Sequence, residues 1–296
     1  MLLSVILPVF LMVGMGFLVG KYQKLDAKTL SNLAIYLLTP SLVFTKYLQY
    51  PVDIQQILKI LVFALALFFS LWIIAYLVSR LLKQDRFERQ GFALSVVLIN
   101  SGNMGLPFVI FAFGDAGMSI GVIFLMINIF TTNSLGVFIA AGAKSHPLAA
   151  LKKMLFWPTL YATAAAILIQ QNGWQVPETF MKPLNMIGDA AIPIAIILLG
   201  VQLSKTKIST ELPQTVAATI LRLFLSPVLA YLLTELMGFT GMIQKILIFQ
   251  TSMPTAVYAA ILSTKFDARP EFVSGVILLT TLLSALTLTG LLYLLN

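Results

Sequence analysis

Two polar interruptions lie inside otherwise apolar segments, at matching positions in the two halves of the chain. The first runs from Asn100 to Pro107 and the second from Gln250 to Thr255. In a lipid bilayer every backbone N–H and C=O group must find a partner within the protein, so an interrupted helix is stable only where the freed groups line a polar cavity or a ligand. Paired interruptions in two repeats are typical of a transporter's binding site. The two segments are therefore the first candidates for a site.

Proline, glycine and neutral polar side chains make up both interruptions. The prolines remove backbone donors and disturb the preceding turn. The half-helix after each interruption would point its free N–H groups and its positive end at the centre, which suits a carboxylate, while opposed carbonyl ends could hold a cation. The alternative is an ordinary proline kink. The predicted substrate-binding residues of the interruptions are Asn100, Ser101, Asn103, Gly105, Pro107, Gln250, Thr251, Ser252 and Pro254.

Three further polar residues lie in apolar segments. Asn128 could line the same cavity or hydrogen-bond between helices. Asp189 is a candidate proton or cation site, although it lies only seven residues from Lys182 and could sit near the outer interface. Arg222 could balance an anionic substrate or form a charge pair with an acid such as Asp189 or Glu235. The sequence alone leaves these alternatives open.

The composition indicates a membrane protein. Hydrophobic residues make up 59% of the chain, charged residues only 10%, and the mean hydropathy is +0.96, far from the values of soluble domains. Cysteine is absent, which excludes disulfides and thiolate metal sites, and we expect no metal and no cofactor. The net charge of +8 comes from residues between the apolar segments, so we expect the lipid bilayer as a partner and no nucleic acid.

The apolar segments predict ten membrane-spanning helices, each long enough to cross about 30 Å of hydrocarbon. Their expected ranges are 2–20, 29–48, 55–80, 91–113, 118–141, 153–171, 182–203, 211–237, 241–263 and 270–295. Of the 19 Lys and Arg residues, fourteen lie in connections after odd-numbered spans and four on the opposite face. The positive-inside rule then places both termini outside. We expect a multi-pass protein of the cell (inner) membrane with periplasmic termini.

The proline positions predict a five-span unit that occurs twice, in residues 1–145 and 146–296. Corresponding prolines are separated by 32 and 67 residues in the first unit and by 35 and 61 in the second: Pro8, Pro40 and Pro107, then Pro158, Pro193 and Pro254. Because each unit has an odd number of spans, the second inserts in the opposite orientation. Such inverted repeats are found in many secondary transporters.

Over nearly its whole length the sequence resembles the auxin efflux carrier family, which has plant and bacterial members. The motifs that carry the resemblance are Leu7-Pro8, Leu38-Thr39-Pro40, Asn100 to Pro107 followed by Gly114-Asp115, Arg222-Leu223-Phe224 with Pro227, Gln250 to Pro254, and Phe266 to Pro270. The resemblance implies ten helices with outside termini. It also implies a scaffold of helices 1, 2, 6 and 7 beside a transport domain of helices 3–5 and 8–10, in which helices 4 and 9 cross as in bile acid symporter-like folds.

Members of this family move organic anions. By motif position, Asn100, Pro107, Asn128, Gln250 and Pro254 would lie at or near the substrate site. The chain departs from the plant carriers in its short central connection, 142–153, and in the absence of a charge from residues 60–79. Neither interruption contains the acid that binds sodium in bile acid symporters, which leaves the coupling ion open.

Together these observations predict an all-α secondary transporter, not an enzyme. It would export small organic anions or carboxylates by an elevator-type mechanism, with the substrate where helices 4 and 9 cross. The alternatives are a sodium- or proton-coupled anion symporter and a non-transporting membrane sensor with a transporter-like fold. An intramembrane enzyme would need a catalytic pair or a zinc set on its helices, and none is evident. The sequence is also compatible with a homodimer.

Overall fold

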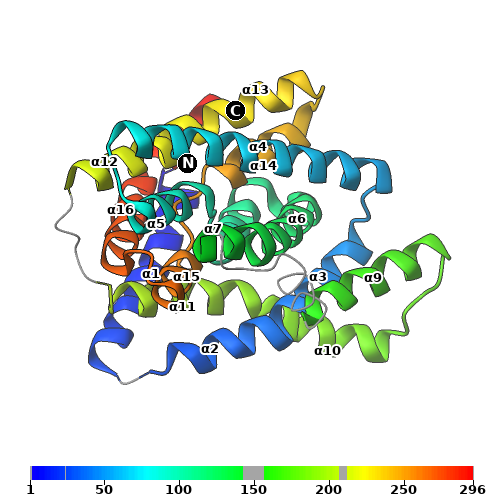
Figure 1. Ribbon diagram of the computed structural model, residues 1–296. Coiled ribbons are helices and arrows are strands. Elements are labelled where there is room, and N and C mark those ends of the chain that lie inside the picture. The colour runs from blue at the N-terminus through cyan, green and yellow to red at the C-terminus, as the bar shows by residue number, and fades with distance from the viewer. Residues whose placement is uncertain (1, 24, 143–156, 207–211, 296) are drawn as a thin grey trace.

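The structure, a computed structural model, describes residues 2–23, 25–142, 157–206 and 212–295, and in these ranges it is helical apart from one antiparallel bridge (Figure 1). Helices long and apolar enough to cross a membrane are Ser4–Tyr22, Ile54–Leu81, Ser101–Ala141, Glu178–Leu203, Leu212–Leu236 and Pro270–Leu295. The chain is therefore an all-helical membrane protein with at least these six apolar helices. The predicted boundary between the repeats, at 145/146, and the start of the predicted sixth span, 153–156, lie outside the described residues.

The first half contains α-helices joined end to end by short π-helical turns, which are named η. The elements are η1 (Leu2–Ile6), α1 (Leu7–Tyr22), α2 (Ala27–Leu33), η2 (Ala34–Leu38), α3 (Thr39–Gln49), α4 (Ile54–Leu81), α5 (Arg86–Val97), η3 (Ser101–Gly105), α6 (Leu106–Thr131), η4 (Thr132–Gly136) and α7 (Val137–Ala141). Helix α6 is broken at Gly114, whose φ of +67° suits a residue without a Cβ atom. The expected junction between the fourth and fifth spans, 113–118, contains this break.

The second half is built in the same way. Its described elements are α9 (Pro158–Gln171), α10 (Glu178–Asp189), α11 (Ala191–Leu203), α12 (Leu212–Ile220), η6 (Leu221–Leu225), α13 (Ser226–Leu236), α14 (Gly241–Thr251), α15 (Tyr258–Phe266) and α16 (Pro270–Leu295). Between α14 and α15 the helical pattern stops at Ser252 and resumes at Tyr258. This gap contains Pro254, as the sequence predicts for the second interruption.

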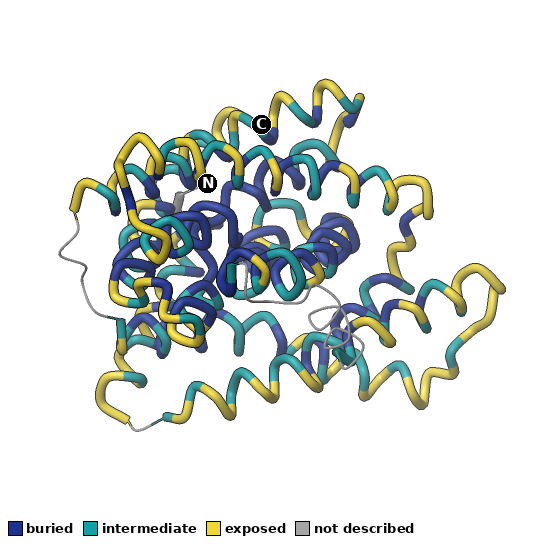
Figure 2. Tube along the Cα trace, in the orientation of Figure 1, coloured by how far each residue is buried: buried dark blue, intermediate teal, exposed yellow. Residues whose placement is uncertain are grey.

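The helices pack in two groups. In one, α1 packs along α11, and α3 packs against α9 and α10; in the other, α4 packs against α5 and α13, and α14 against α6 and α13. Figure 1 shows α3, α9 and α10 in the lower part of the view and α4, α13 and α14 in the upper part. The most buried chain lies in α5 and α6 of the second group, near the centre of the molecule (Figure 2).

The contact between α1 and α11 depends on two glycines. A Cβ atom on Gly16 would lie 3.0 Å from the carbonyl carbon of Ile197, and one on Gly200 would lie 2.6 Å from the backbone nitrogen of Phe17. Gly14, on the same helix as Gly16, has no neighbour within 4 Å of its Cβ position. The two helices therefore approach at backbone distance, as small residues allow in membrane proteins.

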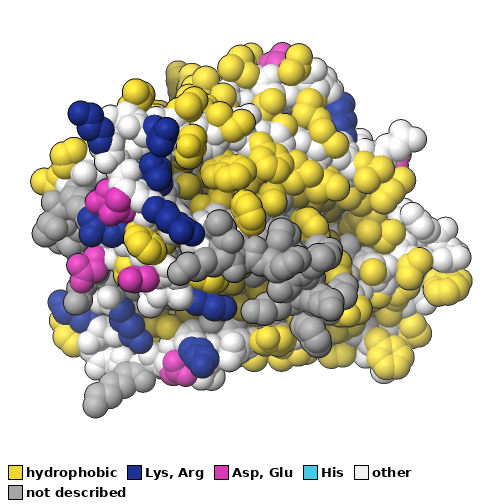
Figure 3. Space-filling model, in the orientation of Figure 1, with side chains coloured by type: hydrophobic (Ala, Val, Ile, Leu, Met, Phe, Trp, Pro, Cys, Tyr) yellow, Lys and Arg dark blue, Asp and Glu magenta, His cyan; other side chains and the backbone are white. Residues whose placement is uncertain are grey.

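The surface matches a bilayer environment. Large hydrophobic side chains are exposed on several outer helices, among them Leu11 and Met15 of α1, Ile73 of α4 and Leu286 of α16. Figure 3 shows a wide hydrophobic area across one face, with Lys and Arg side chains gathered at its left edge. Apolar surface of this extent is stable in lipid and unfavourable in water.

Candidate functional site

The two interruptions lie side by side and are joined through their backbones. The N–H of Asn100 donates to the carbonyl of Pro254 at 3.0 Å, and the N–H of Ala256 donates to the carbonyl of Leu98 at 2.9 Å. Ile99 and Thr255 form the antiparallel bridge. Backbone groups freed by one interruption are thus satisfied by the other, which offsets the cost of breaking a helix in an apolar segment.

The first interruption is shorter than the sequence suggests and lies nearer the N-terminus, since only Asn100 of the predicted residues 100–107 belongs to it. Helix α5 ends at Val97, and helical structure resumes at Ser101, so the non-helical backbone is confined to residues 98–100. The expectation that Pro107 breaks the helix is wrong, because Pro107 lies in the first turn of α6. The chain is already helical from Ser101, and the helical structure continues through Pro107 into α6.

A cavity of about 190 Å³ lies between the two groups of helices, beside the paired interruptions. Four of the predicted site residues line it: Asn100, Ser101, Asn103 and Asn128. The rest of its wall comes from both groups, and includes Thr39, Leu42, Thr132, Asn133, Trp157, Ile192, Ala195, Leu198, Gln202, Val257 and Tyr258. The cavity therefore has a polar side at the first interruption and an apolar side on α3 and α11.

On the polar side, one asparagine Nδ2 donates two hydrogen bonds and another donates none within the described chain. The Nδ2 of Asn128 donates to the carbonyl of Ile99 at 3.0 Å and to the Oγ of Ser101 at 2.6 Å. Asn128 thus both lines the cavity and joins two helices. Asn100 is only 5% exposed, and its Nδ2 has no hydrogen-bond partner among the described residues. A buried donor of this kind is costly unless something else accepts from it.

The other predicted residues lie behind this wall and do not line the cavity. Thr251 and Ser252 are buried and donate their hydroxyls back to carbonyls of α14, Ser252 to Ile248 at 2.6 Å. Gln250 is fully buried, and its side chain packs onto Gly105. Gln250 and Thr251 still belong to α14, and Ser252 directly follows its end. Their side chains therefore pack within the protein beside the interruptions. Pro107 and Pro254 are likewise buried outside the cavity wall.

Several residues of the cavity wall are not among those that the sequence predicts. The hydroxyl of Tyr258 donates to the Oδ1 of Asn133 at 3.0 Å beside the cavity. Gln202 has a buried Oε1 without a partner in the described part of the chain. Trp157 lies near the start of the predicted sixth span, a position that is also typical of an interfacial anchor. The one sequence signal for Tyr258 is its place four residues after Pro254.

Arg222 is the most deeply buried charged residue of the described chain, with no exposed surface. Its Nη1 donates to the carbonyl of Val96 at 2.8 Å, and its Nη2 donates to the carbonyl of Thr251 and to the Oγ of Ser226. The Oγ of Ser226 also donates to the Thr251 carbonyl, at 2.9 Å. The guanidinium therefore joins the ends of α5 and α14 beside the two interruptions.

Of the two alternatives for Arg222, the charge pair with Asp189 or Glu235 is not formed. Asp189 instead lies 3.8 Å from the Nζ of Lys46, and Glu235 accepts from the side chain of Gln244. The side chain of Asp189 is 66% exposed, in accord with the alternative that it lies near an interface. The sequence does not separate these cases: Glu235 lies on the same continuous helix as Arg222, Leu212–Leu236, but more than three turns further along, and Asp189 lies at the end of α10.

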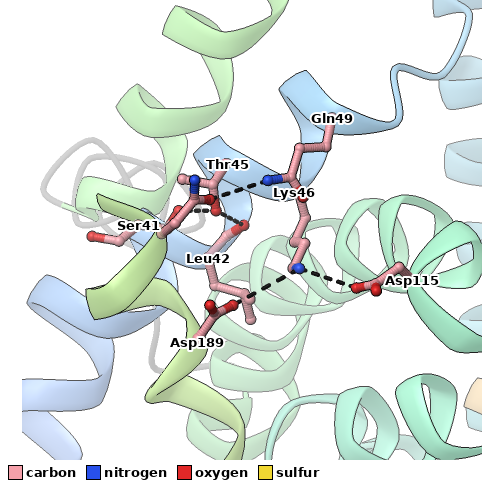
Figure 4. A network of polar contacts seen from close by, with 8 residues as sticks. Ser41, Leu42, Thr45, Lys46, Gln49, Asp115 and Asp189 are labelled. Carbon is pink, nitrogen blue, oxygen red and sulfur yellow. Dashed lines mark hydrogen bonds and ion pairs between the residues drawn. The ribbon is translucent and has the colours of Figure 1, made fainter. Parts of the chain in front are cut away.

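Lys46 reaches across from α3 to two carboxylates (Figure 4). Its Nζ lies 3.1 Å from Asp115, just after the break in α6, and 3.8 Å from Asp189 at the end of α10. The Lys46 side chain is 13% exposed, whereas those of Asp115 and Asp189 are 55% and 66% exposed. The Lys46–Asp115 pair is a polar contact between the two groups of helices.

Comparison with known proteins agrees with this architecture. The family model described as "Membrane transport protein" matches residues 1–292. An uncharacterized transporter of Methanocaldococcus jannaschii is 27% identical, over 97% of this chain and 96% of its own. A Rhizobium meliloti protein named "Putative malonate transporter" is 26% identical over 99% of this chain and 95% of its own. Auxin efflux carrier component 8 of Arabidopsis thaliana is 23% identical over 47% of this chain and 40% of its own.

These relatives are transporters rather than enzymes, and the family match spans nearly every helix described above. The chain belongs to the membrane transport protein family, the family of the auxin efflux carriers.

Proposed function

We propose that this protein is a secondary transporter that exports small organic anions, and that its substrate occupies the cavity beside the paired interruptions. The observation that carries the proposal is Asn100, a residue that lines the cavity and whose buried Nδ2 has no acceptor in the described chain. A carboxylate oxygen is the acceptor that such a donor lacks. The first turn of η3 adds backbone N–H groups and the positive end of a helix on the same side.

The size of the cavity limits the substrate to a few carbon atoms. Its volume of about 190 Å³ is below the ~300–1,000 Å³ of pockets that hold drug-sized ligands. The polar side formed by Asn100, Asn103 and Asn128 would take a carboxylate, and the apolar side would contact the carbon chain. The name of the Rhizobium meliloti relative makes malonate the first substrate to test.

Transport requires that the cavity open to each side of the membrane in turn. We take the group of α1, α3, α9, α10 and α11 as the scaffold and the group of α4–α7 and α12–α16 as a transport domain that shifts against it as an elevator. In this proposal the segments form ten crossings in two inverted repeats, with α5–α6 and α14–α15 crossing at the interruptions. The basic residues would face the cytoplasm and both termini the periplasm.

The membrane potential can drive export of an anion without another ion. Moving one negative charge out of a negative interior releases about 2.3 kcal/mol per 100 mV. In this proposal the substrate must carry a negative charge, and it is transported without chemical change.

The test is malonate binding and efflux with purified protein and proteoliposomes. We expect Asn100→Ala to weaken malonate binding by about 10- to 100-fold, because a hydrogen bond to a charged group contributes about 1.5–3 kcal/mol. Asn100→Asp should abolish binding, since its carboxylate would repel the anion. Asn172→Ala is the matched control, because it removes the same side chain at a position away from the cavity. The Asn172 amide donates to the carbonyl of Leu168 at 2.8 Å, just past the end of α9.

Two results would contradict the proposal. One is that neither malonate nor any other small carboxylate binds the wild-type protein. The other is that Asn100→Ala binds the carboxylate as tightly as Asn172→Ala does.

A further inference from the structure

Arg222 satisfies the carbonyl ends of two helices at once. Val96 lies in the last turn of α5, Thr251 is the last residue of α14, and the Arg222 guanidinium donates to both carbonyls. The last four carbonyls of a helix have no partner within it, and a helix end of this kind carries about half a negative charge. Arg222 therefore faces two such ends, which together equal about one elementary charge.

The helices that follow the two interruptions begin with positive amide ends, and no acidic side chain of the described chain neutralises these ends. Ser101 begins η3 and Tyr258 begins α15, and both residues line the cavity. Their N–H groups form the positive ends of half-helices. Since Arg222 neutralises the carbonyl ends, the positive amide ends dominate at the cavity. The centre of the molecule is then electrostatically prepared for an anion.

No carboxylate among the described residues pairs with Arg222. The hydrogen bonds of its guanidinium go to two carbonyls and to Ser226, and its Nε has no partner in the described chain. A buried cation without an acid is costly in a membrane protein and by default marks a functional position. Converging carbonyls are also the ligands that a sodium ion would use, and the guanidinium already occupies them.

We infer that Arg222 is a built-in counter-cation, which holds the carbonyl ends of the two interrupted helices where a transported cation would otherwise be needed. Anion binding therefore requires no sodium. This inference rests on the proposed function and deepens it, because it assigns a uniport rather than a sodium-coupled mechanism to the same site. Arg222 acts through the helix ends and is a positioning residue, since it does not line the cavity.

The experiment measures malonate binding to the full-length protein in sodium chloride and in choline chloride at equal ionic strength. We expect the wild-type dissociation constant to agree within about twofold between the two salts. Arg222→Gln should weaken binding at least tenfold, about 1.4 kcal/mol, and Arg222→Lys should recover part of the loss. Added guanidinium ion, far below denaturing concentrations, should partly restore binding to Arg222→Ala, which a purely structural role does not predict.

Lys59→Gln is the matched control. Lys59 also donates to a carbonyl just past a helix end, that of Gly238 at 3.2 Å, but it lies on α4 away from the cavity. Its removal changes the net charge equally and should leave malonate binding unchanged.

The outcomes separate this inference from the proposed function. Sodium-dependent malonate binding to the wild type would overturn the inference and leave the transporter proposal standing. A folded Arg222→Gln variant that binds malonate like the wild type would do the same. If the Arg222 variants do not fold, the comparison of salts on the wild type still decides. Failure of every small carboxylate to bind the wild type would overturn the proposed function and this inference together.

Discussion

The contact between Gly105 and Gln250 allows a sharp test of how closely the two interruptions pack. A Cβ atom on Gly105 would overlap the Oε1 of Gln250 and lie 2.9 Å from its Cδ. Gln250 is fully buried, and Gly121 confines its amide from the other side, with the Nε2 at 3.5 Å from the Gly121 carbonyl. The side chain therefore has no free space to move into. Gly105→Ala should force the two interruptions apart.

The expected cost follows from two opposing effects. Overpacking a well-filled interior costs about 1–3 kcal/mol, whereas replacing glycine by alanine in a helix gains up to about 1 kcal/mol. We therefore expect Gly105→Ala to lower the free energy of unfolding by about 1–2 kcal/mol. Gly102→Ala is the matched control in the same turn, because its Cβ would lie at an ordinary 3.4 Å from the Cδ1 of Leu125.

The assay is reversible unfolding in mixed micelles with increasing SDS, followed by tryptophan fluorescence. Combining Gly105→Ala with Gln250→Ala should cost less than the sum of the single variants, by about 1 kcal/mol, because residues in contact are not additive. Equal effects of Gly105→Ala and Gly102→Ala would refute the reasoning, as would strict additivity with Gln250→Ala.

Two further predictions concern the contacts of α1 and α3. Gly16→Ala should destabilise the protein by about 1–3 kcal/mol, because its Cβ would meet backbone that cannot yield. Gly14→Ala on the same helix should be neutral or stabilising by up to about 1 kcal/mol, and equal unfolding free energies of the two variants would contradict the packing. A double-mutant cycle should give a coupling of about 0.2–1 kcal/mol between Lys46 and Asp115 that falls at high salt. The coupling of Lys46 to Asp189 should be smaller, because that pair is longer and more exposed, and the reverse order would refute this account.

The helical membrane class and the existence of two interruptions can be predicted from the sequence, because prolines and amides are rare inside apolar segments unless the helix is broken nearby. The direction of individual side chains cannot. Gln250 and Asn100 look equivalent in the sequence, yet only Asn100 faces the cavity. The difference depends on where the helix stops: Gln250 still belongs to α14, while Asn100 lies in the extended segment that pairs with Pro254.

Long-range partners are equally hidden in the sequence. A buried arginine predicts an acid nearby, but for Arg222 the carbonyl ends of two helices supply the negative charge instead, and backbone groups have no signature in the side-chain sequence. Lys46 looks like a charge outside the membrane, although it reaches Asp115 from another group of helices. These contacts depend on tertiary packing, which brings together residues that no local pattern relates.

The backbone bonds between the two interruptions have a consequence for how such a protein can diverge. They join the N–H of Asn100 to the carbonyl of Pro254, and the N–H of Ala256 to the carbonyl of Leu98. Neither bond involves a side chain, and Pro254 contributes only its carbonyl, so the N–H that proline lacks is not needed there. Mutation can therefore change the side chains of residues 98–100 and 254–256, and with them the preferred substrate, while the backbone bonds between the two halves are kept.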